Sequence, residues 1–163
     1  MHPEALAFIR ANIGNPTTVL EYGSLNINGT ARFTAPNAAW YGVDLQAGPG
    51  VDQVADAADY VHPTPVDAVV CAEVLEHTRW VGAITKNAWD SLNPGGVFIV
   101  TCATEGRAPH SAVDGGPVRT DEYYRNVPAD DYRVTLEHVG FTIELLEVHP
   151  TRGDLYVKAR RDG

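Results

Sequence analysis

The sequence predicts an α/β fold: a doubly wound, mostly parallel sheet with helices on both faces and an antiparallel hairpin at its C-terminal end. Two observations carry this prediction. Apolar segments of strand length alternate with segments of helical spacing, the order that builds parallel sheets. Residues 66–71 and 97–102 are almost continuously apolar, as expected of strands that are buried on both faces.

The first half of the chain predicts one helix and three strands. Helical apolar spacing covers residues 3–13, and Gly14 and Pro16 end the helix. Short strands are expected over residues 18–22, 39–44 and 51–54, the last of them weak.

The second half predicts the centre and the far edge of the sheet. Residues 66–71 form a buried strand, and residues 80–92 form a helix that stops at residues 93–96, Asn-Pro-Gly-Gly. Residues 97–102 are the strongest strand prediction. The remaining expectations are a loop over 103–118, a helix over 129–139, and hairpin strands over 141–148 and 154–159 that are broken at residues 150–153.

Composition agrees with a single domain over residues 1–163. The chain is 44% hydrophobic and 20% charged, close to ordinary globular values. Twelve Lys and Arg against 21 Asp and Glu give a net charge of −9. A chain this acidic gains no counterion release from a nucleic-acid backbone, so a broad nucleic-acid surface is excluded.

The sequence also bears on location. No apolar stretch approaches the roughly 18 residues that span a bilayer, and the first residues lack the features of a signal peptide, so we expect no membrane contact. Cys71 and Cys102 lie in apolar runs, where a buried thiol is the usual interpretation. With neither a disulfide framework nor a CxxC zinc site, the chain is expected to be cytoplasmic.

Polar residues gather where the predicted strands end. Parallel α/β sheets bind ligands outside the carboxyl ends of their strands, which favours an enzyme or a nucleotide-binding protein. The residues at such ends are Glu21 to Ser24, Asp44, Asp56, Glu73 and Thr104.

A tight turn at Gly23 and an acid at Asp44, the end of the next strand, together predict a nucleoside site, because such an acid can accept both hydroxyls of a ribose. A dinucleotide site needs two further glycines, and this chain has Leu25 and Asn28 at those positions. The P-loop pattern is absent too. S-adenosylmethionine has a ribose and an adenine but no phosphate, and it fits this loop better than NAD, FAD or a nucleoside triphosphate.

The ordered motifs resemble those of the class I S-adenosylmethionine-dependent methyltransferases of the small, type 11 sort. This resemblance implies a Rossmann-like sheet of seven strands, and Leu25 is the one departure in the first loop. The motifs are Val-Leu-Glu-Tyr-Gly-Ser at 19–24, Tyr-Gly-Val-Asp at 41–44, Ala-Asp-Ala at 55–57, Asp-Ala-Val-Val-Cys-Ala-Glu-Val-Leu-Glu-His at 67–77, Leu-Asn-Pro-Gly-Gly at 92–96 and Gly-Phe at 140–141.

The resemblance implies a set of contacts with S-adenosylmethionine. Asp44 would hold the ribose hydroxyls and Leu45 would pack on the adenine, whose amino group would be accepted by Asp56. The whole set is Glu21, Tyr22, Gly23, Ser24 and Asn28 in the first loop, Asp44 and Leu45 after the second strand, Asp56 and Ala57 after the third, and Ala72 and Glu73 beside the sulfonium.

Two histidines are the candidate catalytic residues. The cofactor carries the activated methyl group, so the protein mainly positions the reactants. A general base is needed only where the acceptor loses a proton, and His77 and His110 are placed to serve. His77 is equally well explained by packing or helix capping, and His110 by an exposed loop.

A metal site is a further alternative. Glu73-Val-Leu-Glu76-His77, with His110 downstream, resembles the metal-binding pattern of the RNA 3′-end 2′-O-methyltransferases. The same pentapeptide occurs in metal-free members of the wider family, and the His-x-x-His element of the RNA enzymes is absent. We therefore expect no metal, and an RNA ribose methyltransferase stays an alternative.

The predicted function is transfer of methyl from S-adenosylmethionine to an O or N atom of an unidentified acceptor, a small molecule or glycan. The alternatives are a non-catalytic module that binds S-adenosylmethionine and regulates a partner, and an NAD-dependent oxidoreductase. A homodimer is possible. Residues 119–125, with two tyrosines and two arginines, either line the acceptor pocket or cover a sheet edge.

Overall fold

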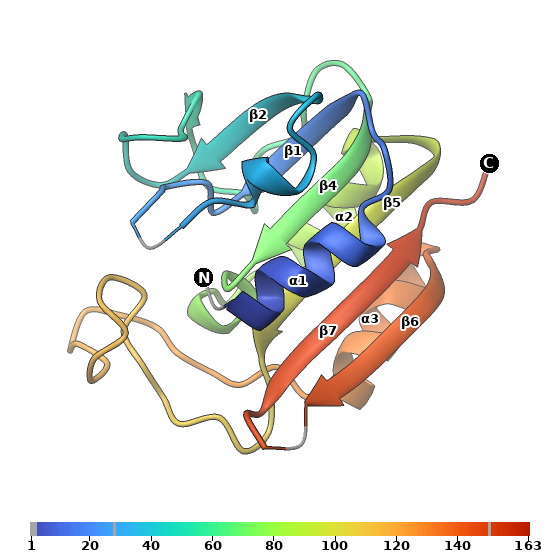
Figure 1. Cartoon of the computed structure of the whole chain (residues 1–163). Helices are drawn as coiled ribbons and strands as arrows, with labels where there is room; N and C mark the ends of the chain where they lie inside the picture. Colours follow the sequence, from blue (N-terminus) through green and yellow to red (C-terminus); the bar gives the residue numbers. More distant parts are fainter. Residues whose placement is uncertain (1–2, 28, 150) are drawn as a thin grey trace.

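The computed structural model describes residues 3–27, 29–149 and 151–163. Figure 1 shows one twisted sheet flanked by short helices. In chain order the elements are α1 Pro3–Asn12, β1 Thr18–Tyr22, the 3-10 turn η1 Ala31–Thr34, β2 Ala39–Asp44, β3 Gln53–Val54, β4 Val66–Ala72, the 3-10 turn η2 Leu75–His77, α2 Val81–Ser91, β5 Leu92–Ala103, α3 Ala129–Val139, β6 Thr142–His149 and β7 Asp154–Arg160.

The seven strands lie in the order β3-β2-β1-β4-β5-β7-β6. The pairs from β3 to β5 are parallel, and β7 runs antiparallel to both β5 and β6. This is the doubly wound, mostly parallel sheet with a C-terminal antiparallel hairpin that the sequence predicts, so the fold-class prediction is confirmed.

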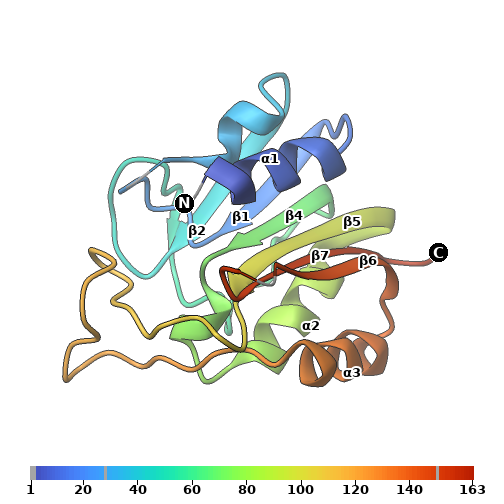
Figure 2. The same ribbon diagram turned by 60° about the horizontal axis from the view of Figure 1, so that its bottom comes forward.

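Helices cover both faces of the sheet, as Figure 2 shows: α1 and η1 on one face, α2 and α3 on the other. Side chains alternate along β1, so this strand contributes residues to the hydrophobic core on each face of the sheet. Leu20 and Tyr22 join the core beneath α2 and α3, and Val19 joins the core beneath α1. A parallel strand that is buried in this way on both sides must be apolar nearly throughout, which explains the sequence of the central strands.

The boundaries that differ most from the sequence-based expectation are those of β5 and β3. Strand β5 begins at Leu92 rather than Val97, because Gly95 donates to the Arg161 carbonyl and Arg161 donates to the Gly96 carbonyl, which extends the ladder. Strand β3 has two residues instead of four. The helix predicted over residues 80–92 is α2, one residue shorter at each end.

The chain between β5 and α3 is irregular and reaches away from the carboxyl ends of the central strands, in yellow and orange at the lower left of Figure 1. The sequence predicted only residues 103–118 as a loop, and residues 119–128 continue it. Pro150, at the predicted hairpin break, lies outside the described residues, and the flanking strands β6 and β7 pair as predicted. Within the described ranges, no helix has the length and apolar character needed to cross a membrane.

Candidate functional site

The order of the strands reverses between β1 and β4. The chain leaves β1 towards β2 on one side and leaves β4 towards β5 on the other, which opens a crevice at the carboxyl edge. Gly23 turns the chain there with φ +75°, and a Cβ on it would stand 2.2 Å from Val74 Cγ2. The amide of Gly23 donates to the Val43 carbonyl at 2.9 Å, so the first loop also lies against the end of β2. Only glycine fits this turn.

Glu21 is buried beside this turn, under η1. Burial raises the pKa of its carboxyl to about 7, and the Ala31 amide and the Arg32 guanidinium partly oppose that rise. Among the described residues, neither Glu21 Oε2 nor the buried hydroxyl of Ser24 has a hydrogen-bond partner. Buried polar atoms are rarely left unpaired in native proteins. These two atoms are therefore candidates to receive a polar ligand.

Asp44 is held by the main chain of the loops around it. Its Oδ2 accepts from the Leu25 amide at 3.0 Å and its Oδ1 accepts from the Gln46 amide at 3.1 Å. Each carboxylate oxygen has a second acceptor position, so the carboxylate can also accept two hydroxyls. Leu45, the next residue, is 68% exposed and offers an apolar surface beside it.

The turn after β3 carries two predicted contacts. Asp56 Oδ1 accepts from the Ala58 amide at 2.8 Å, which closes the turn on itself. Asn87 of α2 donates to the carbonyls of Ala57 and Ala58, at 3.0 and 2.8 Å, and so ties the turn to the helix. The structure therefore places Asp56 and Ala57 at the same edge of the sheet as Asp44, in a fixed turn.

Two of the predicted cofactor-contact residues, Tyr22 and Asn28, differ from the others. The ring of Tyr22 is fully buried, and its hydroxyl donates to the Tyr60 carbonyl at 2.8 Å, so only the main chain of Tyr22 can face a ligand. Burial raises the pKa of that phenol far above its ordinary value. Asn28 lies outside the described residues.

The backbone is strained where β4 ends. Glu73 has φ +59°, the one positive value recorded for a residue other than glycine in the described part of the chain. Two bonds to β5 hold it there: its amide donates to the Thr101 carbonyl at 2.7 Å, and its Oε1 accepts from Thr101 Oγ1 at 3.0 Å. Such strain is typical of functional sites. It places Ala72 and Glu73 at the crevice beside Gly23.

Glu76 is fully buried in η2, directly after this strained residue. Its Oε1 accepts from the Ala103 amide at 3.1 Å. Burial and the neighbouring Glu73 carboxyl raise its pKa to about 8, although Arg107 and two backbone amides oppose the rise. The sequence drew attention to Glu76 only through a metal-binding pattern.

His77 and His110, the two candidate general bases, lie next to each other. Their ring centroids are 5.2 Å apart, and Tyr124 packs edge-on against both rings at 5.4 and 5.0 Å. Burial, reinforced by His110, lowers the pKa of His77 to about 4. His77 is therefore neutral at physiological pH and a weaker base than an ordinary histidine. Sequence reasoning did not single out Tyr124 by itself, and its signal was the aromatic segment 119–125.

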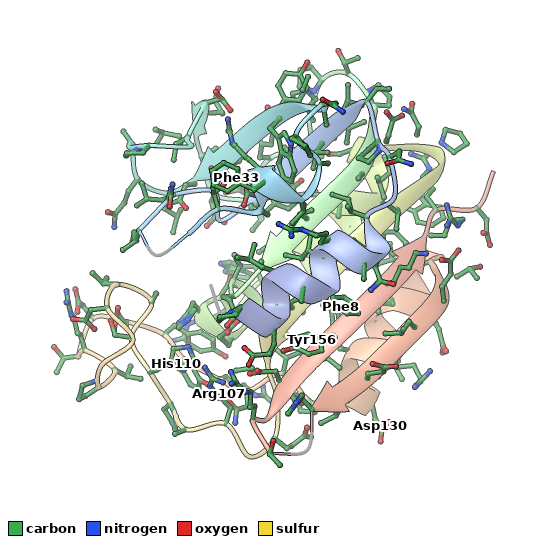
Figure 3. All side chains as sticks on the ribbon, in the orientation of Figure 1. Phe8, Phe33, Arg107, His110, Asp130 and Tyr156 are labelled. Carbon is green, nitrogen blue, oxygen red and sulfur yellow. The ribbon has the colours of Figure 1, made fainter. Side chains whose placement is uncertain are left out.

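The long loop is fixed against the strand ends by specific bonds. Arg107 pairs with the buried Asp154 of β7 at 2.8 Å, and Ser111 donates to Glu122 at 2.7 Å. Figure 3 shows Arg107 and His110 on this loop, on the side towards which α1 points its N-terminal end. His110 is thereby held near η2.

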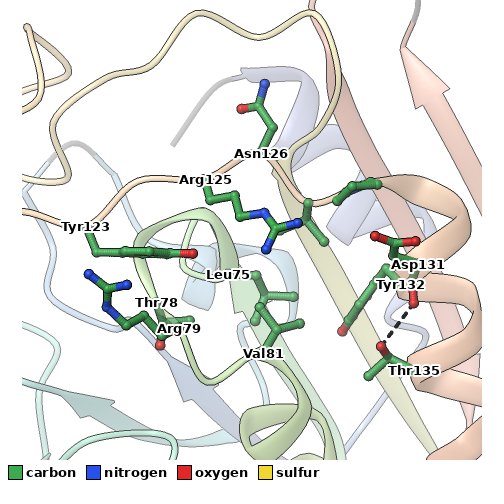
Figure 4. A pocket seen from close by; sticks show the side chains of 12 residues that line it. Leu75, Thr78, Arg79, Val81, Tyr123, Arg125, Asn126, Asp131, Tyr132 and Thr135 are labelled. Carbon is green, nitrogen blue, oxygen red and sulfur yellow. Dashed lines mark hydrogen bonds between the residues drawn. The ribbon is translucent and has the colours of Figure 1, made fainter.

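A cavity of about 190 Å³ lies beside η2, between the starts of α2 and α3. Tyr123 and Arg125, from the aromatic segment 119–125, line it. Arg79 lies over the Tyr123 ring at 4.3 Å, as Figure 4 shows. Leu75 and Thr78, which flank His77 in the sequence, line the same cavity.

No family model and no curated protein matches this chain in sequence. Solved structures match it over almost its whole length. A 1,6-didemethyltoxoflavin N1-methyltransferase from Burkholderia thailandensis, solved with bound 1,6-didemethyltoxoflavin and S-adenosylhomocysteine, has a TM-score of 0.74 at 19% identity, over 99% of this chain and 78% of that one.

Two further matches agree. The N-methyltransferase NodS from Bradyrhizobium japonicum WM9, solved with S-adenosylhomocysteine, has a TM-score of 0.70 at 15% identity, over 98% of this chain and 86% of that one. A putative S-adenosylmethionine-dependent methyltransferase from Listeria monocytogenes has a TM-score of 0.70 at 18% identity, over 98% and 96%. The chain therefore has the fold of the class I S-adenosylmethionine-dependent methyltransferases.

Proposed function

We propose that this protein binds S-adenosylmethionine at the crevice between β1 and β4 and transfers its methyl group to an O or N atom of a small acceptor. The observation that carries the proposal is the set of groups at the carboxyl edge: the Gly23 turn, the Asp44 carboxylate and the unpaired Glu21 and Ser24 oxygens. A fold alone hosts many functions, so the argument rests on these groups.

The residues present fit that cofactor. The Gly23 turn lets a ligand approach the main chain, and the buried oxygens of Glu21 and Ser24 suit the amino and carboxylate ends of a methionine moiety. Asp44 is placed for the two ribose hydroxyls, and the exposed face of Leu45 for the adenine. Asp56 and Ala57 would contact the adenine edge, and Ala72 and Glu73 would border the sulfonium.

When bound, S-adenosylmethionine supplies a methyl group attached to a positively charged sulfur. That sulfur is the leaving group, and it needs no further activation. The protein's residues have two tasks. They hold the acceptor atom in line with the methyl group, and they take a proton from an acceptor that must lose one. His77, His110 and Tyr124 stand next to the strained end of β4 and form the candidate acceptor side.

A small-molecule acceptor is favoured over a larger one by the dimensions of the acceptor side. The cavity of about 190 Å³ next to η2 has room for one small ring system, and Tyr123 and Arg125 offer it a flat aromatic face and a cation. A glycan residue would fit the same cavity. A homodimer and a cytoplasmic location remain predictions from the sequence.

Isothermal titration calorimetry with S-adenosylhomocysteine tests cofactor binding, and the dinucleotide NAD is the control ligand. Binding of the first and not of the second is expected. A screen with methyl-labelled S-adenosylmethionine against hydroxyl- and amine-bearing acceptors tests turnover. Tight cofactor binding without transfer to any acceptor class would support a regulatory module instead, and binding of NAD alone would support an oxidoreductase.

A further inference from the structure

Three side chains from two distant segments meet beside η2 with ligand atoms that face one another. One carboxylate oxygen of Glu76 and one ring nitrogen each of His77 and His110 all lie within 4.8 Å of one another. Ligands around one transition-metal ion stand about 2.0–2.2 Å from it, and so about 3–4 Å from one another. The observed limit of 4.8 Å on the separations of the three atoms is within about 2 Å of that spacing.

The carboxylate of Glu76 is buried, and only one of its two oxygens accepts a hydrogen bond from the described residues. Its side chain is fully shielded from solvent, and Oε1 accepts from the Ala103 amide. In the described part of the chain, Oε2 has no hydrogen-bond partner. Leaving such an oxygen unpaired in a dry environment is costly. A cation at this position would satisfy it.

Each imidazole has one ring nitrogen engaged by the main chain, which leaves the other available as a ligand atom. The His77 ring hydrogen-bonds the Tyr123 main chain, while among the described residues its Nδ1 has no partner. His110 Nδ1 donates to the Ala108 carbonyl at 3.2 Å, which leaves Nε2 as its acceptor atom. Metal-binding histidines are held in the same way, with the second ring nitrogen donating to a carbonyl or carboxylate.

The charges around the cluster also suit a cation. Two further acidic side chains lie nearby, Glu73 beside Glu76 and Glu122 beside His77, with Arg107 as the opposing positive charge. Arg107 is itself paired with Asp154.

We propose that Glu76, His77 and His110 form a site for one divalent first-row transition-metal ion. Two imidazoles and a carboxylate suit Zn²⁺, Mn²⁺ or Fe²⁺, whereas Mg²⁺ and Ca²⁺ prefer oxygen ligands alone. Three protein ligands leave coordination positions open, as in catalytic metal sites. This differs from our expectation, from the sequence, of a metal-free protein.

An open position would take an oxygen or nitrogen atom of the acceptor and lower the pKa of a bound hydroxyl, whose proton would pass to solvent. That use of the ion rests on the proposed methyl transfer, but ion binding itself does not. With the ion present, the two imidazoles are ligands and not proton acceptors. Activity would then depend on the metal and not on the titration of either histidine.

The test is calorimetric titration of the chelator-treated full chain with ZnCl₂ and with MnCl₂, with MgCl₂ as the control salt. One ion per chain is expected, and no comparable heat with Mg²⁺. Glu76→Gln keeps the acceptor for the Ala103 amide but removes the anionic ligand, and His110→Ala removes a ligand from the loop. Each is expected to weaken binding by at least about tenfold.

His138→Ala is the matched control, because His138 is an exposed histidine on α3, away from the cluster. Its metal affinity should equal that of the unmodified chain. Co²⁺ substitution gives a second readout: ligand-to-metal geometry appears in its visible absorption spectrum, and His110→Ala should change that spectrum. If Glu76→Gln fails to fold, the His110→Ala comparison alone decides.

Absence of one-to-one binding, or equal affinity in His110→Ala and His138→Ala, would overturn the metal site. Titration of the same metal-free protein with S-adenosylhomocysteine tests the proposed function separately. A chain that binds the nucleoside and not the metal retains the proposed function and loses this inference. One that binds the metal and not the nucleoside does the reverse.

Discussion

Gly23 and Val74 meet where the order of the strands reverses, so closely that a Cβ on Gly23 would lie 2.2 Å from Val74 Cγ2. One residue follows β1 and the other follows Glu73 at the end of β4, so this contact joins the two loops that border the proposed cofactor crevice. The positive φ of Gly23 and the lack of room for a side chain act together to require glycine there.

Gly23→Ala is therefore expected to lower the free energy of unfolding by about 2–4 kcal/mol, the sum of left-handed backbone strain and overpacking. Gly14→Ala is the control, because Gly14 has φ +74° but a Cβ on it would meet no described atom within 4 Å. It should cost only about 1–2 kcal/mol. Urea unfolding measures both, and equal losses would show that the Val74 contact is unimportant.

The buried carboxyl of Glu21 predicts a pH dependence of stability. Its pKa is about 7 in the folded chain against 4.5 when unfolded. The folded state therefore binds the proton more tightly, and the stabilisation is complete below pH 4.5 and is lost as the pH rises through 7.

Glu21→Gln removes this titration. Its free energy of unfolding relative to the unmodified chain is expected to rise by about 3 kcal/mol between pH 4.5 and pH 8, since a tenfold change in proton binding corresponds to about 1.4 kcal/mol. Urea unfolding without cofactor, at several pH values, provides the measurement. Parallel pH profiles for the two proteins would mean that Glu21 titrates as an ordinary exposed carboxyl.

His77 is predicted to remain neutral across the physiological range. Its pKa is lowered to about 4 by burial and by His110, so in the metal-free protein its ring proton resonances should move only below about pH 5. A pH titration followed by NMR, with His77→Gln to assign the signals, measures this. A midpoint near 6.5 would show that the ring is solvated and that the cluster with Tyr124 does not form in solution.

Much of the fold follows from the sequence, for physical reasons. Strands such as Val66–Ala72 are buried on both sides and are apolar except at Asp67, so their sequence alone identifies them. The Asn-Pro-Gly-Gly residues at 93–96 likewise predict the end of α2 to within a few residues. The start of β5 was wrong because its first pairs depend on Arg161, far away in the chain. Local patterns carry no information about such partners.

The sequence placed the site less completely. Gly23 and Asp44 could be proposed from the sequence, because a glycine or an acid directly after a strand is recognised from the neighbouring residues alone. Tyr124 packs against His77 and His110 because the long irregular loop is held in place, in part by the ion pair between Arg107 and Asp154. Hydrophobic periodicity in the sequence does not predict such an ion pair. The unpaired oxygen of the Glu76 carboxylate likewise could not be predicted, because identifying it requires the burial of the side chain to be known.

Asp44 is the residue on which the proposed recognition of the cofactor depends. Asp44→Ala should weaken S-adenosylhomocysteine binding by about 1–3 kcal/mol, because the ribose hydroxyls lose their acceptor. Asp59→Ala removes an exposed carboxylate from the same edge and serves as the control for charge. Calorimetry compares the two, and equal losses of affinity would indicate a general charge effect.

The most direct measurement is the distance from the ribose hydroxyl oxygens to the Asp44 carboxylate in a crystal structure of the complex with S-adenosylhomocysteine. Our account predicts two hydrogen bonds of about 2.5–3.0 Å, with the methionine end against the Gly23 turn. A ligand bound away from the ends of β1 and β2, or crystals that exclude it at saturating concentration, would contradict the account.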